Sequence, residues 1–205
     1  LAGGNATRLG AAAALEHGGK AAVPYRGKTF LARVVESVAA EVERVVVVAA
    51  TAQPVAAAGS IVVRDAEPGC GPLAGIRDGL VALAAAVPEA SLAVVVSCDV
   101  PLLRREVVRR LVDTAAVSQA AWTVPVVHGH RQVLVSVLRT DLVPRIDAWL
   151  AAGRRDVRGL VDRIAREDPR GVRELAEAEL RAVDPALESF LDVDTPEDLE
   201  RLLGR

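Results

Sequence analysis

Short runs of β-branched residues alternate with longer helical patterns along the first 120 residues of this 205-residue chain. The runs are continuously apolar and cover residues 45–48, 61–63 and 93–96. Such runs are typical of strands that are covered on both faces of a sheet. Apolar residues with helical spacing cover residues 29–42, 73–87 and 104–116. This alternation predicts an α/β fold built on a mostly parallel sheet.

The second half of the chain predicts an antiparallel addition to that sheet. Residues 122–126 and 132–137 alternate between apolar and polar positions, and the polar turn 128–130 separates them, a pattern that favours an antiparallel excursion. Farther along, residues 156–164 and 173–181 are predicted amphipathic helices.

The end of the chain predicts a strand followed by a capped helix. Residues 190–193 are expected to form a short strand. Thr195 then follows as a helix N-cap, with Pro196 at the first helical position and Asp198 closing a capping box.

Composition bounds the class of protein. A mass of 21.5 kDa without a low-complexity linker predicts a single domain over residues 1–205. The longest apolar run, residues 80–87, is far shorter than the roughly 20 residues of a membrane span, so no membrane association is expected. A net charge of -2 gives no reason to expect nucleic-acid binding. Two cysteines cannot form a disulfide framework, and a cytoplasmic location is expected.

The opening segment is rich in glycine. Gly3, Gly4 and Gly10 surround Arg8, so bare backbone could approach a ligand and present amide hydrogens to an anion. An ordinary flexible turn is the alternative. A glycine loop in an α/β fold normally follows the first strand, and we therefore expect an apolar strand ahead of Leu1.

Two aspartates follow apolar runs. Asp99 comes shortly after the run 93–96, and Asp65 comes directly after the run at residues 61–64. Ligands bind at the carboxyl ends of strands in open α/β sheets, where a carboxylate such as that of Asp99 can hold Mg²⁺. The alternative for both is that they cap a turn.

Other motifs are less informative. Residues 22–29 resemble a phosphate-binding loop but lack its first glycine, and residues 69–75 predict a tight turn that leads into a helix amino end. Cys70 and Cys98 are interpreted as small buried groups rather than nucleophiles. Lys20 and Lys28 are the two lysines among 25 cations, and a compact ammonium suits phosphate charge.

Four motifs, taken in chain order, resemble those of the MobA-like molybdenum cofactor guanylyltransferases. They are Leu1-Ala2-Gly3-Gly4 with Arg8 and Gly10, Gly71-Pro72-Leu73-Ala74-Gly75-Ile76, Ser97-Cys98-Asp99-Val100-Pro101, and Asp194-Thr195-Pro196-Glu197-Asp198-Leu199. The resemblance implies a Rossmann-like, three-layer nucleotidyltransferase fold. It also implies that the chain joins GMP, from GTP, to molybdopterin and releases pyrophosphate with Mg²⁺.

The resemblance assigns roles to residues by position. Backbone groups of Leu1, Ala2, Gly3 and Gly4 would meet the nucleoside, together with Asp65 and Gly75. Lys20 and Arg8 would act on the phosphates, and Asp99 would hold the metal. Gln132 and Asp194 fall on the acceptor side. The nucleotide half would span about residues 1–100 and the acceptor half about residues 101–205.

Two alternatives remain open at this point. The chain could use CTP or another phosphorylated acceptor, because backbone groups can satisfy either base. It could also bind nucleotide without efficient catalysis, since nine residues separate Gly10 from Lys20. GTP and molybdopterin are the expected small-molecule partners, with transient contact to proteins that deliver molybdopterin.

Overall fold

The structure of the chain is a computed structural model that describes residues 1–2, 19–50, 53, 55, 57–65 and 70–204. Its strands are β1 (Pro24–Tyr25), β2 (Lys28–Thr29), β3 (Val46–Ala49), β4 (Ile61–Arg64), β5 (Leu92–Val96), β6 (Trp122–Val127), β7 (His130–Arg131), β8 (Val135–Arg139) and β9 (Val172–Leu175). Its α-helices are α2 (Phe30–Ala39), α3 (Pro72–Ala86), α4 (Arg105–Ser118), α5 (Val143–Ala151), α6 (Val157–Glu167), α7 (Glu177–Arg181) and α8 (Pro196–Leu203). Short 3-10 helices are η1 (Lys20–Ala22), η2 (Thr140–Leu142) and η3 (Glu188–Phe190).

The strands combine parallel and antiparallel pairs. β3 and β4 pair in parallel, with Val46 opposite Ile61. β8 lies between β5 and β6 and is antiparallel to both, while β9 joins β6 in parallel. β6 and β7 form a hairpin in which His128 and Gly129 both have positive φ, as the predicted turn requires. The predicted α/β class is confirmed.

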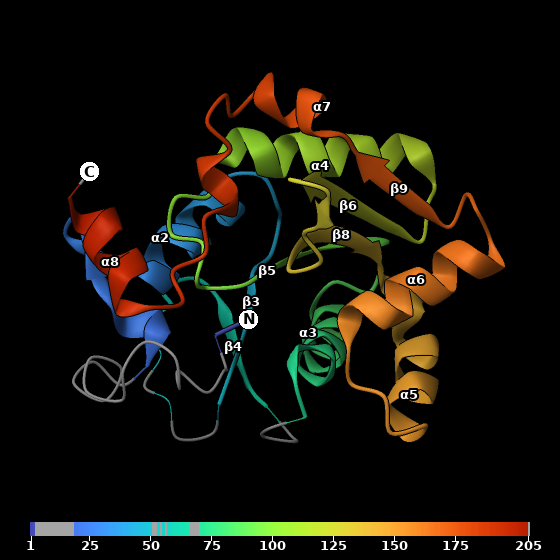
Figure 1. Cartoon of the computed structure of the whole chain (residues 1–205). Helices are drawn as coiled ribbons and strands as arrows, with labels where there is room; N and C mark the ends of the chain where they lie inside the picture. Colours follow the sequence, from blue (N-terminus) through green and yellow to red (C-terminus); the bar gives the residue numbers. More distant parts are fainter. Residues whose placement is uncertain (3–18, 51–52, 54, 56, 66–69, 205) are drawn as a thin grey trace.

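Helices cover both faces of the sheet (Figure 1). On one face, α2, α4 and α7 pack against one apolar side of β5 and β8, including Val96 and Val137. On the other face, α3, α5 and α6 pack against Val95 of β5 and Trp122 of β6. The apolar run of β5 therefore contributes to two cores, which explains why its sequence does not alternate. Within the described residues no helix is long and apolar enough to cross a membrane.

The first two residues lie between β3 and β5. The Ala2 amide donates to the Val48 carbonyl at 2.8 Å, and the Leu1 ammonium donates to the Val96 carbonyl at 2.6 Å. An apolar cavity of about 440 Å³ extends from Leu1 between these two strands, with α2 and α3 along its walls. The expected strand ahead of Leu1 stays a prediction.

Two local predictions near the carboxyl end are wrong. The predicted helix over residues 173–181 is a strand, β9, followed by the short helix α7, because pairing with the edge of β6 overrides the helical spacing. Residues 190–193 do not form the predicted strand, since η3 ends at Phe190 and the chain then crosses to another loop. The capped helix is confirmed: Thr195 Oγ1 accepts from the Asp198 amide at 3.2 Å, and the Thr195 amide donates to Asp198 Oδ2 at 3.0 Å.

A buried hydrogen bond in the sheet gives a stability prediction. The fully buried Trp122 indole donates to Ser136 Oγ at 2.9 Å, and Ser136 Oγ donates in turn to the Val133 carbonyl at 2.8 Å. We expect Ser136→Ala to lower the free energy of unfolding by about 1–3 kcal/mol, because the indole N–H loses its partner. Urea denaturation measures the change. Val117→Ala, at a position 82% exposed, is the control, and equal losses in both variants would contradict the prediction.

Candidate functional site

An ion pair joins the beginning of the described chain to its end. Lys20 is the first residue of η1, and its ammonium donates to the carboxylate of Asp194, which lies just before α8. The two residues are 174 positions apart in the sequence. Their side chains are 17% and 34% exposed, so the pair is partly shielded from water. Solvent screens such a pair less than it screens an exposed one.

Asp99 lies beside this ion pair. It is half-buried three residues past the end of β5, and its carbonyl accepts a hydrogen bond from the Val193 amide at 2.9 Å. The neighbouring Cys98 amide donates to the Leu1 carbonyl at 3.1 Å. These contacts bring the segments of Leu1, Lys20, Asp99 and Asp194 together, as the sequence motifs predict.

The Cys98 thiol lies within the electrostatic field of this cluster. Burial raises its pKa to about 11, Asp99 adds to the increase, and the Lys20 ammonium acts in the opposite direction. A thiol with so high a pKa is protonated at neutral pH, which supports the interpretation of Cys98 as a packed group rather than a nucleophile.

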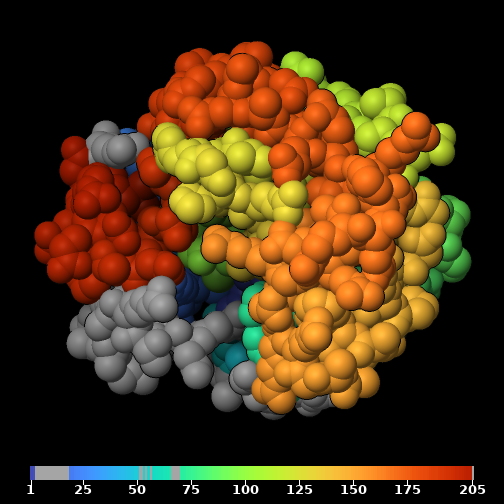
Figure 2. All heavy atoms as spheres, turned by 45° about the vertical axis from the view of Figure 1, so that its right-hand side comes forward, coloured from blue at the N-terminus to red at the C-terminus, as the bar shows by residue number. Residues whose placement is uncertain are grey.

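A cavity of about 330 Å³ opens next to Asp99, and neither Leu1 nor Lys20 lines it. Its walls come from residues 97–100 after β5, residues 131–135 between β7 and β8, residues 156–158 at the start of α6, Pro72, Phe190 and Asp192. Figure 2 shows this hollow between the red C-terminal segment, the yellow β6–β7 hairpin and the orange start of α6. Gln132 lines it, and its amide donates to the His130 carbonyl at 3.3 Å. The predicted role of Gln132 on the acceptor side stays a prediction.

Carboxylates dominate the charge around Asp99. Burial raises the pKa of Asp192, and the nearby carboxylates of Asp194, Asp99 and Asp198 raise it further. The sequence motifs did not single out Asp192, although its place in Asp192-Val193-Asp194 offered a signal. Arg131 and Arg158 add cationic groups to the same cavity, and no sequence signal marked them. Nowhere in the described ranges do three His, Cys, Asp or Glu side chains form a metal-binding group.

Glycines allow the helix α3 to approach the first residues closely. A Cβ at Gly75 would lie 3.2 Å from Leu1 Cδ2 and 3.7 Å from Val48 Cγ1, so the position suits glycine, as the resemblance implies. Gly71 precedes α3 with a φ of 81°, which favours glycine, and Pro72 then starts the helix at the cavity. The predicted turn into a helix amino end is therefore confirmed.

The remaining predicted residues are placed differently. Asp65 follows β4, and its amide donates to the Ala49 carbonyl at 2.9 Å, which extends the pairing of β4 with β3. Gly3, Gly4 and Arg8 lie outside the described residues. Their predicted contacts with nucleotide and phosphate stay predictions.

The fold and the site define a class of enzyme. Residues 1–168 match the family of MobA-like NTP transferase domains, and the chain belongs to this family. It is accordingly a nucleotidyltransferase, and the resemblance found from four motifs is confirmed.

Curated relatives carry a more particular description. A probable molybdenum cofactor guanylyltransferase of Mycobacterium avium is 36% identical over 162 residues, which are 79% of this chain and 78% of the relative. A protein of the same description from Mycobacterium tuberculosis is 35% identical over 164 residues, which are 79% of this chain and 77% of the relative.

Solved structures share the fold. Molybdopterin-guanine dinucleotide biosynthesis protein A from Archaeoglobus fulgidus superposes with a TM-score of 0.74 at 20% identity, over 99% of this chain and 94% of that one. The 2-C-methyl-D-erythritol 4-phosphate cytidylyltransferase of Thermus thermophilus gives 0.68 at 18% identity, over 90% and 92%. A Mycobacterium tuberculosis protein in complex with manganese gives 0.61 at 21% identity, over 90% and 91%.

The raised pKa of Cys98 predicts how the thiol reacts with iodoacetamide. An ordinary thiol stops gaining thiolate above about pH 9. With a pKa of about 11, the thiolate fraction of Cys98 should still increase about tenfold between pH 9 and 10, and its labelling rate should increase with it. Mass spectrometry of the Cys70→Ser variant measures the labelling rate, with the same protein in urea as control. A rate that levels off near pH 9 in the folded protein would contradict the prediction.

Proposed function

We propose that this nucleotidyltransferase transfers GMP from GTP to molybdopterin, which yields the guanine dinucleotide cofactor and pyrophosphate. The observation that carries the proposal is the convergence of three segments around Asp99: Lys20 pairs with Asp194, the adjacent Val193 donates to the Asp99 carbonyl, and Cys98 donates to the Leu1 carbonyl. Of these residues, Asp99 lines the cavity of about 330 Å³. An amine, a carboxylate and bare backbone are the groups that a nucleoside triphosphate needs for binding and reaction. The description of the curated relatives supports the same substrates.

The proposed reaction is a direct displacement at phosphorus. An ionised oxygen of the terminal phosphate of molybdopterin bonds to the α-phosphorus of GTP. The bond from that phosphorus to the bridging oxygen breaks, and pyrophosphate leaves with the electron pair. The attacking oxygen is already ionised, so the step requires no general base. Catalysis then rests on positioning and on stabilising charge.

Lys20 is the residue proposed to stabilise the leaving pyrophosphate. Its ammonium is held by Asp194 and is only partly exposed, so it is oriented before substrate arrives. Charge on the leaving oxygens gives this ammonium a stronger partner as the bond breaks. Arg8 is proposed to assist at the same phosphates.

Magnesium is the proposed cofactor, with Asp99 as its ligand. Mg²⁺ takes hard oxygen donors and is commonly held by one or two carboxylates together with substrate phosphates. The donors present fit this description, because Asp99 and Asp192 line one cavity. When bound, the ion would neutralise phosphate charge. The manganese complex of a relative with the same fold supports a divalent cation.

Nucleotide and acceptor are proposed to bind on opposite sides of Asp99. Backbone groups of Leu1 and Ala2, with those of Gly3 and Gly4, would contact the guanine and ribose, and Asp65 would help to hold the nucleoside. The cavity lined by Gln132 would take molybdopterin, where Arg158 supplies a cation for its phosphate. Arg131 also lines this cavity, but it is paired with Asp162 and Glu174.

This arrangement fits one domain over residues 1–205 with a nucleotide half and an acceptor half. We also propose that the protein works in the cytoplasm and meets molybdopterin-delivering proteins transiently.

A second candidate function is transfer from CTP, favoured by the fold likeness to a cytidylyltransferase. Thermal unfolding with GTP, CTP, ATP and UTP, each with Mg²⁺, separates the candidates. At a concentration about 100-fold above its Kd, GTP should raise Tm by about 5–10 °C, since ligand binding stabilises the folded state. The same panel with EDTA is the control. A larger shift with CTP would contradict guanylyl transfer.

Substitution of the two lysines tests the chemistry. Lys20→Ala should lower the rate of pyrophosphate release from GTP and molybdopterin by about 10²–10³-fold, with little change in the preference for guanine. Lys28→Ala is the matched control, because Lys28 pairs with Glu36 on an exposed surface at 2.7 Å.

Asp99→Ala should abolish turnover, because the proposed metal ligand is lost. Near-normal magnesium-dependent release by Asp99→Ala would overturn the assignment, and no release by the unaltered protein would indicate a nucleotide-binding homologue.

A further inference from the structure

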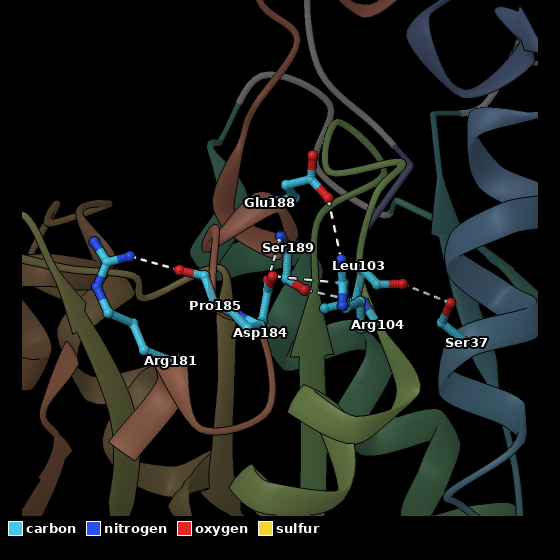
Figure 3. A network of polar contacts seen from close by, with 8 residues as sticks. All are labelled: Ser37, Leu103, Arg104, Arg181, Asp184, Pro185, Glu188 and Ser189. Carbon is cyan, nitrogen blue, oxygen red and sulfur yellow. Dashed lines mark hydrogen bonds and ion pairs between the residues drawn. The ribbon is translucent and has the colours of Figure 1, made fainter. Parts of the chain in front are cut away.

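The C-terminal segment that carries Asp192 and Asp194 is attached to the Asp99 loop at two places. One attachment is the hydrogen bond from the Val193 amide to the Asp99 carbonyl, 2.9 Å long. The other is a polar cluster of Arg104 with Asp184, Glu188 and Ser189, which lie four to nine residues before Val193 and are shown in Figure 3. The stretch between the two attachments passes the acceptor-side cavity.

Asp184 is the centre of the polar cluster. Its side chain is fully buried, and its Oδ2 accepts from the Ser189 amide at 2.8 Å. Its Oδ1 lies 3.5 Å from Arg104 Nε. Arg104 closes the cluster in two further ways: its backbone amide donates to Ser189 Oγ at 3.0 Å, and its Nη2 donates to Glu188 Oε2 at 3.2 Å.

The Arg104 side of the cluster is fixed in place. Leu103 accepts from Ser37 Oγ at 2.7 Å, and Pro101 accepts from Arg33 Nε at 3.0 Å, so α2 holds the loop that contains Asp99. Arg104 is also the N-cap residue of α4. The loop therefore offers a rigid base to which the C-terminal segment is attached.

The Asp184 side of the cluster is also held in place by contacts to other parts of the chain. Arg181 Nη1 donates to the Pro185 carbonyl at 2.6 Å, which ties the turn to α7. Leu187 and Phe190 belong to the same apolar core as Val100 and Leu103. Packing and polar contacts thus act together on one short stretch of chain.

The energetics favour a geometric role for the charged pair. Removing the Asp184 carboxylate from water is costly, and its ion pair with Arg104, whose side chain is 42% exposed, contributes little to net stability. The contacts are directional, however, because Oδ2 accepts from the Ser189 amide, whereas Oδ1 has no hydrogen-bond partner among the described residues and lies 3.5 Å from Arg104 Nε. Within the cavity, Phe190 and Asp192 stand between the two attachments and face Asp99.

We propose that Asp184, acting through Arg104 and Ser189, is a positioning residue that sets where Asp192 stands relative to Asp99. This inference rests on the proposed function, since the affected side is the one that would receive the acceptor. Loosening the cluster lets the segment move away from Asp99. Nucleotide binding at Leu1 and Ala2, which lie on the other side of Asp99, stays unchanged.

The first test needs no substrate. In Arg104→Ala, the peptide containing Val193 should exchange its amide hydrogens about tenfold faster, because one of its two attachments loses the side-chain contacts to Asp184 and Glu188. Peptides from β6 and β8 should exchange as before. Ser189→Ala, which removes only the acceptor for the Arg104 amide, should act in the same direction and does not leave a buried charge. Arg110→Ala, at an exposed position on α4, is the matched control.

The second test uses kinetics. Asp184→Asn and Arg104→Ala should each raise KM for molybdopterin about tenfold and leave KM for GTP within about twofold, because misplacing a binding group affects one substrate. Arg104→Lys should restore part of the loss, since it returns a cation to Asp184.

Opposite results would overturn the inference. These are an unchanged exchange rate at Val193 in both Arg104→Ala and Ser189→Ala, or an equal rise in KM for both substrates. If the unaltered protein releases no pyrophosphate, the proposed function fails, and the exchange at Val193 alone then decides whether the cluster positions the segment.

Discussion

The ion pair between Lys20 and Asp194 constrains the whole arrangement of the site. It links residues 174 positions apart, and it does so next to the loop whose Asp99 carbonyl accepts from Val193. A phosphate oxygen is chemically similar to the carboxylate that already holds the ammonium, so a bound triphosphate would compete for a cation that is held in place beforehand. Both ends of the chain must therefore be folded before this cation is in position.

Local signals account for the parts of the fold and site that the sequence predicts. The apolar run of β5 followed by Asp99, the Gly71-Pro72 start of α3 and the Thr195 cap each depend on neighbours within a few residues. Tertiary contacts decide the parts that it misses. β9 is a strand because β6 offers it an edge, and Asp192 joins the site because the segment after η3 crosses to Asp99. The pairing of β9 has no local sequence signature, since it depends on a partner far along the chain, and the signal for Asp192 was limited to its place beside Asp194.

Charge around Asp99 explains why a cation would be needed at this site. The carboxylates of Asp99, Asp194 and Asp198 lie close enough to Asp192 that each of them raises its pKa. Lys20 is already paired, so the described cluster has an excess of negative charge when empty. A triphosphate approaching alone would meet repulsion, whereas one that arrives with a divalent cation would not. The carboxylates thus favour a metal-bound nucleotide over a free one.

The proposed nucleotide and acceptor sides of Asp99 consist of different kinds of groups. This difference determines how substitutions could alter each side. The proposed nucleotide side consists of main-chain groups of Leu1 and Ala2 and of Gly75, which lacks a side chain, so its shape depends on backbone position. The acceptor side uses side chains on separate loops, joined by the cluster of Arg104, Asp184 and Ser189. Substitutions can alter such a set of side chains one at a time without disturbing the sheet. A fold of this kind can therefore change its acceptor side while its sheet stays the same.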